Sequence, residues 1–141
     1  MEVSENETIT VEATVNAPIE KVWACWTDPA HITQWYHASD DWHAPFAEND
    51  LQIGGSFKTT MAAKDGSFRF DFGGVYTEVR EFDLIAYQIH DGRKVSITFE
   101  STNEGTKVTE TFETENIHPH DMQLAGWQAI LDNFKKHVES K

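Results

Sequence analysis

The feature that most constrains the fold is a C-terminal stretch with the periodicity of a long amphipathic helix. Between about Pro119 and Glu139, apolar residues recur every three or four positions, which places them on one face of a helix. This stripe consists of Leu124, Trp127, Leu131, Phe134 and Val138, with Ile130 at its edge. Such a wide apolar face must be covered by another element, and a sheet is the simplest cover.

The chain before this helix consists mostly of short segments in which apolar and polar residues alternate, separated by glycine-containing turns. This pattern is typical of antiparallel strands. Residues 18–35 instead predict two short helices divided at Asp28-Pro29, an N-cap followed by a first-turn proline. Residues 36–49 are expected to be largely irregular, with a candidate strand near Trp42, and residues 50–63 to form a strand bent at Gly54-Gly55.

These elements predict an α+β fold of the helix-grip type. A curved antiparallel sheet of about six or seven strands surrounds the long C-terminal helix, and two short helices follow the first strand. The length of 141 residues is typical of one domain, with an ordered core at about 8–139. Nine Phe and five Trp residues supply rings for a core or for the wall of an apolar cavity.

Composition excludes several classes of partner. The net charge of −13 disfavours nucleic acid and anionic membrane surfaces, and no apolar run is long enough for a membrane span. We therefore expect a cytoplasmic protein that is a monomer or a weak dimer. The single cysteine, Cys25, excludes an intramolecular disulfide and is expected to be a buried core thiol.

Several short motifs occur together in an order that resembles one family. They are Ala17-Pro18, Val22-Trp23, Trp26-Thr27-Asp28-Pro29, Trp35-Tyr36, Gly54-Gly55-x-Phe57, Gly74-Val75-Tyr76 and Gly126-Trp127. From about Ile9 to Val138 the chain resembles the bacterial homologues of the C-terminal domain of the activator of the 90-kDa heat-shock-protein ATPase. These belong to the START-like, birch-pollen-allergen-like superfamily (SRPBCC). The resemblance implies the helix-grip fold and a cavity between the sheet and the C-terminal helix.

Aromatic residues and a few polar ones are the candidates for lining that cavity. The predicted set is Trp35, Tyr36, Trp42, His43, Phe57, Phe70, Phe72, Tyr87, Phe99, Glu110, Trp127 and Leu131. Gly126, next to Trp127, is expected to permit a close approach of the backbone. No dinucleotide-binding fingerprint, P-loop or hydrolase nucleophile motif is present, and no cofactor is predicted.

Three residues are candidates for acid–base chemistry: Glu110, His43 and Arg69. Glu110 alternates with Val108 and Phe112, so it faces the cavity unless a bulge turns it outward. A separate group, His37-x-x-Asp40-Asp41-x-His43, has residue types that can bind a metal ion, but loop His and Asp residues are usually solvated. No metal site is therefore predicted.

Three functions are compatible with these observations. The leading one is the binding of a small apolar or amphipathic ligand between the sheet and the long helix. The first alternative is a cyclase, dehydratase or hydrolase-like enzyme of the START-like superfamily, using acid–base residues in the cavity. The second alternative, implied by the resemblance alone, is a co-chaperone-like domain that binds a heat-shock chaperone.

Overall fold

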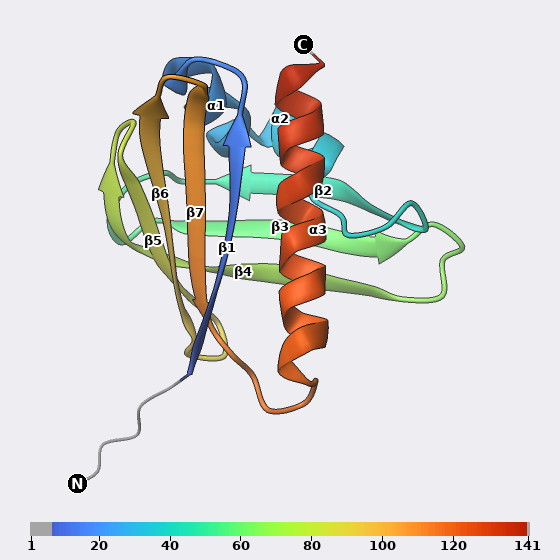
Figure 1. Cartoon of the computed structure of the whole chain (residues 1–141). Helices are drawn as coiled ribbons and strands as arrows, with labels where there is room; N and C mark the ends of the chain where they lie inside the picture. Colours follow the sequence, from blue (N-terminus) through green and yellow to red (C-terminus); the bar gives the residue numbers. More distant parts are fainter. Residues whose placement is uncertain (1–6, 141) are drawn as a thin grey trace, which may run out of the picture.

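The computed structural model describes residues 7–140, so the expectations for residues 1–6 and 141 lie outside the described part of the chain. The elements are β1 (Thr8–Val15), α1 (Ile19–Thr27), α2 (Pro29–Trp35), β2 (Trp42–Asn49), β3 (Ser56–Ala63), β4 (Arg69–Arg80), β5 (Leu84–Ile89), β6 (Lys94–Thr102), β7 (Gly105–Glu113) and α3 (His120–Glu139) (Figure 1). This order confirms the predicted α+β class and the two short helices after the first strand.

The seven strands form one antiparallel sheet in the order β1-β7-β6-β5-β4-β3-β2. The first strand pairs with the last, from Thr8 opposite Glu113 to Val15 opposite Thr106. The sheet is so strongly curved that β2, β3 and β4 run across the direction of β1, β6 and β7 (Figure 1). In β4, a Cβ atom on Gly74 would lie 2.1 Å from the carbonyl oxygen of Gln88, so only glycine fits there.

The two short helices meet at a tight junction. The Asp28 carboxylate accepts a hydrogen bond from the backbone N–H of Ala30 at 2.9 Å, and Pro29 occupies the first turn of α2. These are the capping interactions that the sequence predicts. The indole Nε1 of the buried Trp35 donates to the carbonyl oxygen of Cys25 at 3.0 Å, which ties α2 to α1.

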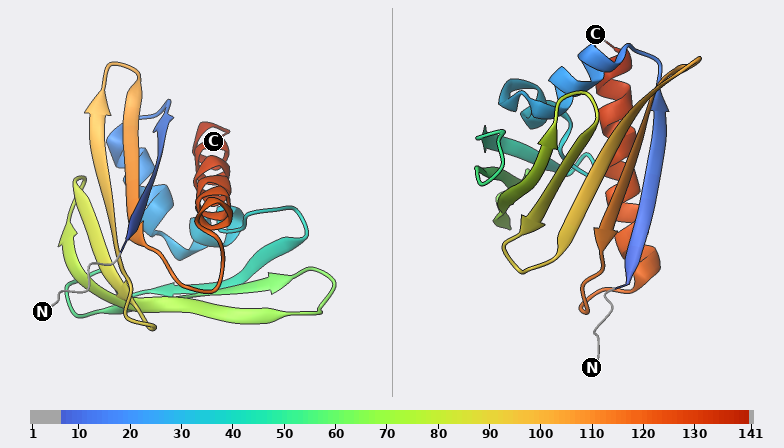
Figure 2. Two further views of the ribbon diagram at one scale, coloured as in Figure 1. Left: turned by 60° about the horizontal axis from the view of Figure 1, so that its bottom comes forward. Right: turned by 90° about the vertical axis from the view of Figure 1, so that its left-hand side faces the viewer.

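Helix α3 lies in the concave side of the sheet (Figure 2). Phe134 is fully buried, and its ring lies 4.8 Å, centroid to centroid, from those of Trp26 and Trp35. The prediction for Leu124 was wrong: 41% of this residue is exposed, whereas Gln123 beside it is buried. No helix in the described part of the chain has both the length and the hydropathy of a membrane span.

The region predicted to be largely irregular, 36–49, contains a full strand, β2, which begins at the candidate strand position Trp42 and continues to Asn49. This strand pairs with β3 from Trp42 opposite Ala63 to Asn49 opposite Phe57, with a register shift between His43 and Phe46. Conversely, Gly54-Gly55 lies in the turn before β3 and not inside a strand. Pro45 falls within the register shift at the edge of the sheet, where a missing N–H is tolerated.

Candidate functional site

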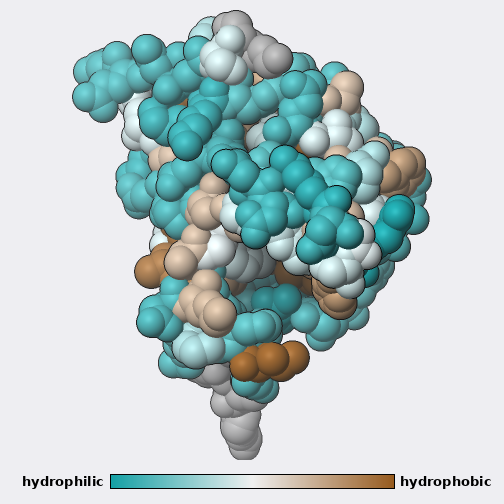
Figure 3. Space-filling model, turned by 90° about the vertical axis from the view of Figure 1, so that its right-hand side faces the viewer, coloured by the Kyte–Doolittle hydropathy of each residue, from teal (hydrophilic) through white to brown (hydrophobic). Residues whose placement is uncertain are grey.

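A cavity of about 580 Å³ lies between α3 and the concave face of the sheet. Its lining consists of Trp26, Trp35, Tyr36, Ala38, Trp42, Met61, Phe70, Phe72, Arg93, Glu110, Glu115, His118, Met122, Gln123, Gly126, Trp127 and Ile130. Most of these side chains are apolar. Figure 3 shows the side of the molecule that was on the right in Figure 1, where hydrophobic residues surround a recess in a mostly hydrophilic surface.

Trp127 forms the wall of the cavity on the α3 side. Its indole stacks flat on the buried ring of Phe112, with centroids 3.9 Å apart and an angle of 9° between the planes. Its edge meets Phe72 at 6.2 Å. Because Trp127 is supported by rings from two strands, it presents a fixed apolar surface to the cavity.

Gly126 leaves space next to this wall. An added Cβ atom at this position would meet no atom within 4 Å. The expected close approach of the backbone at Gly126 is therefore absent, and the expectation was wrong. The missing side chain instead widens the cavity, of which Gly126 is a lining residue.

Glu110 is a carboxyl group in the apolar part of the cavity wall. Only 4% of the residue is exposed, and it sits in the middle of β7 opposite Val11 and Ile97. Among the described residues, none donates a hydrogen bond to its carboxyl group. Burial raises its pKa from 4.5 to about 8, because a charged carboxylate is poorly solvated there. At neutral pH this group is therefore mainly a neutral carboxylic acid.

Two phenol groups lie near Glu110. Tyr36 lines the cavity, and the phenol of the buried Tyr87 lies close to it. Burial raises the pKa of both phenols well above the ordinary value, and the nearby Glu110 carboxyl raises it further. Both phenols therefore stay protonated, so this part of the cavity offers neutral donors and acceptors.

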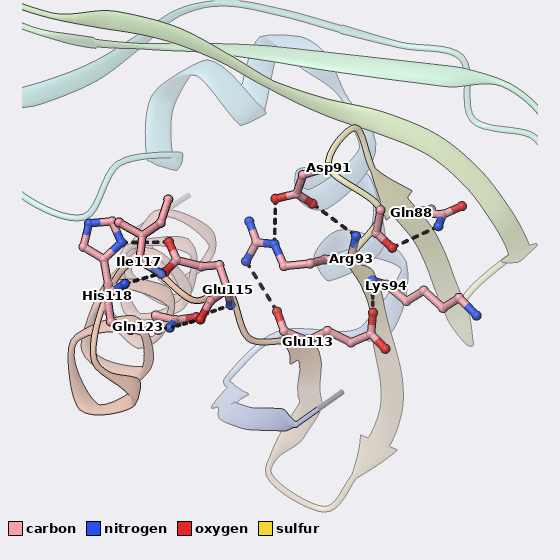
Figure 4. A network of polar contacts seen from close by, with 10 residues as sticks. Gln88, Asp91, Arg93, Lys94, Glu113, Glu115, Ile117, His118 and Gln123 are labelled. Atoms are coloured by element: carbon pink, nitrogen blue, oxygen red, sulfur yellow. Dashed lines mark hydrogen bonds and ion pairs between the residues drawn. The ribbon is translucent and has the colours of Figure 1, made fainter. Parts of the chain in front are cut away.

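Polar groups gather on another part of the wall (Figure 4). Arg93 donates from Nε to the carboxylate of Asp91 at 2.8 Å and from Nη1 to the carbonyl oxygen of Glu113 at 3.4 Å. Its guanidinium is directed toward the segment that carries Glu115 and His118. The side chain of Arg93 is 21% exposed, so the cation lies at the border between cavity and solvent.

Gln123, in the first turn of α3, holds the connecting segment that borders this polar region. Its amide nitrogen donates to the carbonyl oxygens of Glu115 and His118, at 3.1 and 2.8 Å. Its amide oxygen accepts from the backbone N–H of Glu115 at 3.0 Å. A buried amide with three such bonds fixes the segment in place.

The structure brings together part of the predicted cavity set. Trp35, Tyr36, Trp42, Phe70, Phe72, Glu110 and Trp127 lie in the wall. Phe57 and Tyr87 line a small neighbouring pocket of about 40 Å³. Phe99 packs on Trp23 and Trp26, and Leu131 is fully buried. His43 and Arg69 are exposed and outside the cavity lining, as are Asp40 and Asp41.

Some lining residues were not in the predicted set. Arg93 is in phase with the buried residues Val95, Ile97 and Phe99 of β6, so the alternation of this strand could have identified it. Glu115 and His118 come from a connecting segment without periodicity, which gave no such signal.

Comparison with known proteins places these features in a family. The family model for "Activator of Hsp90 ATPase homolog 1-like protein" matches residues 16–139. No protein with curated information matches the sequence.

Solved structures with similar sequences share the fold over nearly the whole chain. An AHSA1-like protein from Aeromonas hydrophila is 46% identical, with a TM-score of 0.90 over 95% of this chain and 93% of that one. A protein from Cytophaga hutchinsonii is 56% identical, with a TM-score of 0.82 over 94% and 92%. A protein from Nitrosomonas europaea shares the fold at 18% identity, with a TM-score of 0.84 over 98% and 97%.

Proposed function

Because this chain belongs to the family of Activator of Hsp90 ATPase homolog 1-like proteins, whose solved relatives share its sheet and long helix, we propose that it binds a small apolar or amphipathic ligand between them. The observation that carries the proposal is the aromatic cavity of about 580 Å³. This volume is within the range of small-molecule sites, and an apolar wall with a few polar groups is their usual composition.

The polar groups of the wall restrict the chemistry of the ligand. Near Glu110 and Tyr36 the cavity offers only neutral groups at neutral pH, so an uncharged hydroxyl, carbonyl or amide fits there. The other polar region contains the Arg93 cation, already paired with Asp91. A polar group of the ligand near Arg93 can therefore remain in contact with water, while its apolar body packs on Trp127 and Phe72.

A substitution that fills the cavity tests the proposal. The Gly126→Leu side chain would project into open space, so we expect the protein to fold but to bind ligands at least tenfold more weakly. Ala125→Leu is the matched control, because Ala125 is the exposed neighbour on the same helix. Binding is measured by NMR titration with medium-chain fatty acids and aromatic carboxylic acids, after native mass spectrometry of the protein as purified.

Two results would overturn this proposal. One is the absence of any ligand, both in the purified protein and in the titrations. The other is binding that Gly126→Leu leaves unchanged, since a ligand in the cavity must meet the new side chain.

The raised pKa of Glu110 favours an enzyme as the second candidate function. A carboxyl group with a pKa of about 8 can take up or release a proton near neutral pH, as a general acid or base must. If the protein catalyses a cyclisation, dehydration or hydrolysis of its ligand, Glu110→Gln should retain binding and lose turnover. Turnover that persists in Glu110→Gln would exclude Glu110 as the acid–base group.

The family description and an exposed aromatic cluster favour a third candidate, a surface that binds a heat-shock chaperone. The cluster consists of Trp42, Phe68 and Phe70, whose rings lie about 6 Å apart. Phe68 is 57% exposed and Phe70 41%. A pull-down with a purified Hsp90-type chaperone should then succeed with the wild type and fail with Phe68→Ser; no enrichment of the wild type would exclude this candidate.

A further inference from the structure

Three side chains with metal-binding atoms come together at the junction of the three helices. They are Cys25 of α1, His31 of α2 and His137 of α3, and one ligand atom from each lies within 4.8 Å of the other two. Cys25 is 2% exposed and His137 is 9% exposed, whereas His31 is partly exposed. This junction lies near the C-terminal end of α3 (Figures 1 and 2).

The two imidazole rings face each other through their nitrogen atoms. Nδ1 of His31 and Nε2 of His137 are 2.8 Å apart, and the ring planes make an angle of 70°. One of these nitrogens must carry the hydrogen that the other accepts. The shared hydrogen therefore lies between the two nitrogens. A cation bound by both rings would take the same position, because the lone pairs of both nitrogens would point at it.

The distances match those of a transition-metal site after a small adjustment. Around a tetrahedral Zn²⁺ ion, with Zn–N of about 2.0 Å and Zn–S of about 2.3 Å, neighbouring ligand atoms lie about 3.3–3.6 Å apart. The two ring nitrogens, 2.8 Å apart, would have to separate by roughly half an ångström, and the sulfur, within 4.8 Å of them, would have to approach by about 1.3 Å at most. Side-chain rotations at the ends of three helices can supply such shifts.

We infer that Cys25, His31 and His137 form a binding site for a borderline-soft transition-metal ion, with Zn²⁺ as the principal candidate. One thiolate and two imidazoles are the ligands that Zn²⁺ and Co²⁺ prefer, whereas Mg²⁺ and Ca²⁺ require oxygen ligands. The three protein ligands leave the fourth position of a tetrahedral ion to a water molecule or another exogenous ligand.

Binding at this site balances in protons and charge. Cys25 releases its thiol proton to solvent, and both histidines remain neutral. The hydrogen shared by the two rings moves to the nitrogen of the same imidazole that faces away from the metal. The site with Zn²⁺ then has a net charge of +1, which the formal charge of −13 on the whole chain favours.

The site is separate from the ligand cavity. None of the three residues lines the cavity, although the cavity reaches Trp26, next to Cys25 in α1, and Ile130, which precedes His137 by 7 positions on α3. The polar border of the cavity is farther away, because Gln123 precedes His137 by 14 positions, roughly 21 Å along the helix axis. The metal would link α1, α2 and α3, so the inference does not depend on the proposed ligand.

Cobalt titration of the reduced protein, freed of metal with a chelator, tests the inference. We expect one Co²⁺ per chain, with a thiolate-to-cobalt charge-transfer band and the intense visible bands of tetrahedral coordination, both removed by Zn²⁺. Cys25→Ser should abolish the charge-transfer band. His31→Gln should weaken binding at least tenfold, and Zn²⁺ should raise the melting temperature of the wild type but not of this variant.

The control is His120→Gln, an exposed histidine on α3 outside the cluster, which should bind like the wild type. Circular dichroism establishes that each variant is folded. If the buried position makes Cys25→Ser unfold, the partly exposed His31 still decides the question. The inference is overturned if the wild type binds no Co²⁺, if the complex lacks the thiolate band, or if His31→Gln binds with wild-type affinity.

Discussion

At the scale of single residues, the most informative group is the Glu110 carboxyl. Its pKa is raised from 4.5 to about 8 in the folded protein. Between these two pH values the folded state binds more protons at this position than the unfolded state does, so the contribution of Glu110 to stability falls as the pH rises. Glu110→Gln has no such titration. From about pH 5 to about pH 8.5, its free energy of unfolding should therefore gain roughly 2–5 kcal/mol relative to the wild type.

Urea denaturation of both proteins at several pH values measures this gain as a difference, which cancels the contributions of all other titrating groups. Glu81→Gln is the control, because Glu81 is an exposed carboxylate. The gain of Glu110→Gln with rising pH should exceed any change seen for Glu81→Gln. The assignment of Glu110 as a buried, uncharged acid would be contradicted if the difference in free energy of unfolding between Glu110→Gln and the wild type did not change with pH. It would also be contradicted if Glu110→Gln gained stability relative to the wild type toward low pH.

At the scale of elements, α3 combines packing with an open position. Gly126 is in the helix interior, and an added Cβ atom would meet nothing within 4 Å. Gly126→Ala should therefore raise the free energy of unfolding by about 0.5–1 kcal/mol, because alanine is the better helix former. Gly74→Ala is the opposing control, since its Cβ would lie 2.1 Å from the carbonyl oxygen of Gln88. Equilibrium urea unfolding should show a higher free energy of unfolding for Gly126→Ala and a lower one for Gly74→Ala.

The elements differ in how well sequence alone predicts them, for physical reasons. The helical periodicity of the C-terminal stretch predicted the limits of α3 to within one residue. Apolar residues that recur every three or four positions over many turns indicate a long helix and no other element. Strand β2 was predicted only as a candidate near Trp42 and not at its full length, because it is an edge strand that contains Pro45 and few buried residues. Leu124 was misplaced because periodicity alone does not show which face of each helical turn is covered, and in this turn Gln123 is buried in its place.

The residues of the candidate sites also differ in how well sequence predicts them. Patterns within one element identify some of them, whereas others depend on contacts between elements that are distant in the sequence. Aromatic wall residues were predictable from the pattern within one element, Trp127 from the helical period of α3 and Phe72 from the alternation of β4. The Cys25, His31 and His137 cluster was not, because it depends on how three helices meet, and sequence separation gives no distance. The same holds for Gln123 and the segment that it fixes.

At the scale of the whole molecule, charge is the dominant property. Folding gathers a net charge of −13 into a compact volume, so repulsion between carboxylates destabilises the native state. The ion pairs that the structure describes are mostly exposed, and such pairs contribute only about 0–1 kcal/mol each.

Screening by salt should therefore weaken the repulsion between carboxylates more than it weakens the attraction within ion pairs. We expect the melting temperature at neutral pH to rise as NaCl is added from about 10 mM to about 300 mM, since the Debye length falls from about 30 Å to below 8 Å. The rise, followed by circular dichroism, should vanish near the isoelectric point, where little net charge remains. A melting temperature that falls with salt at neutral pH would mean that attractive pairs outweigh the net charge.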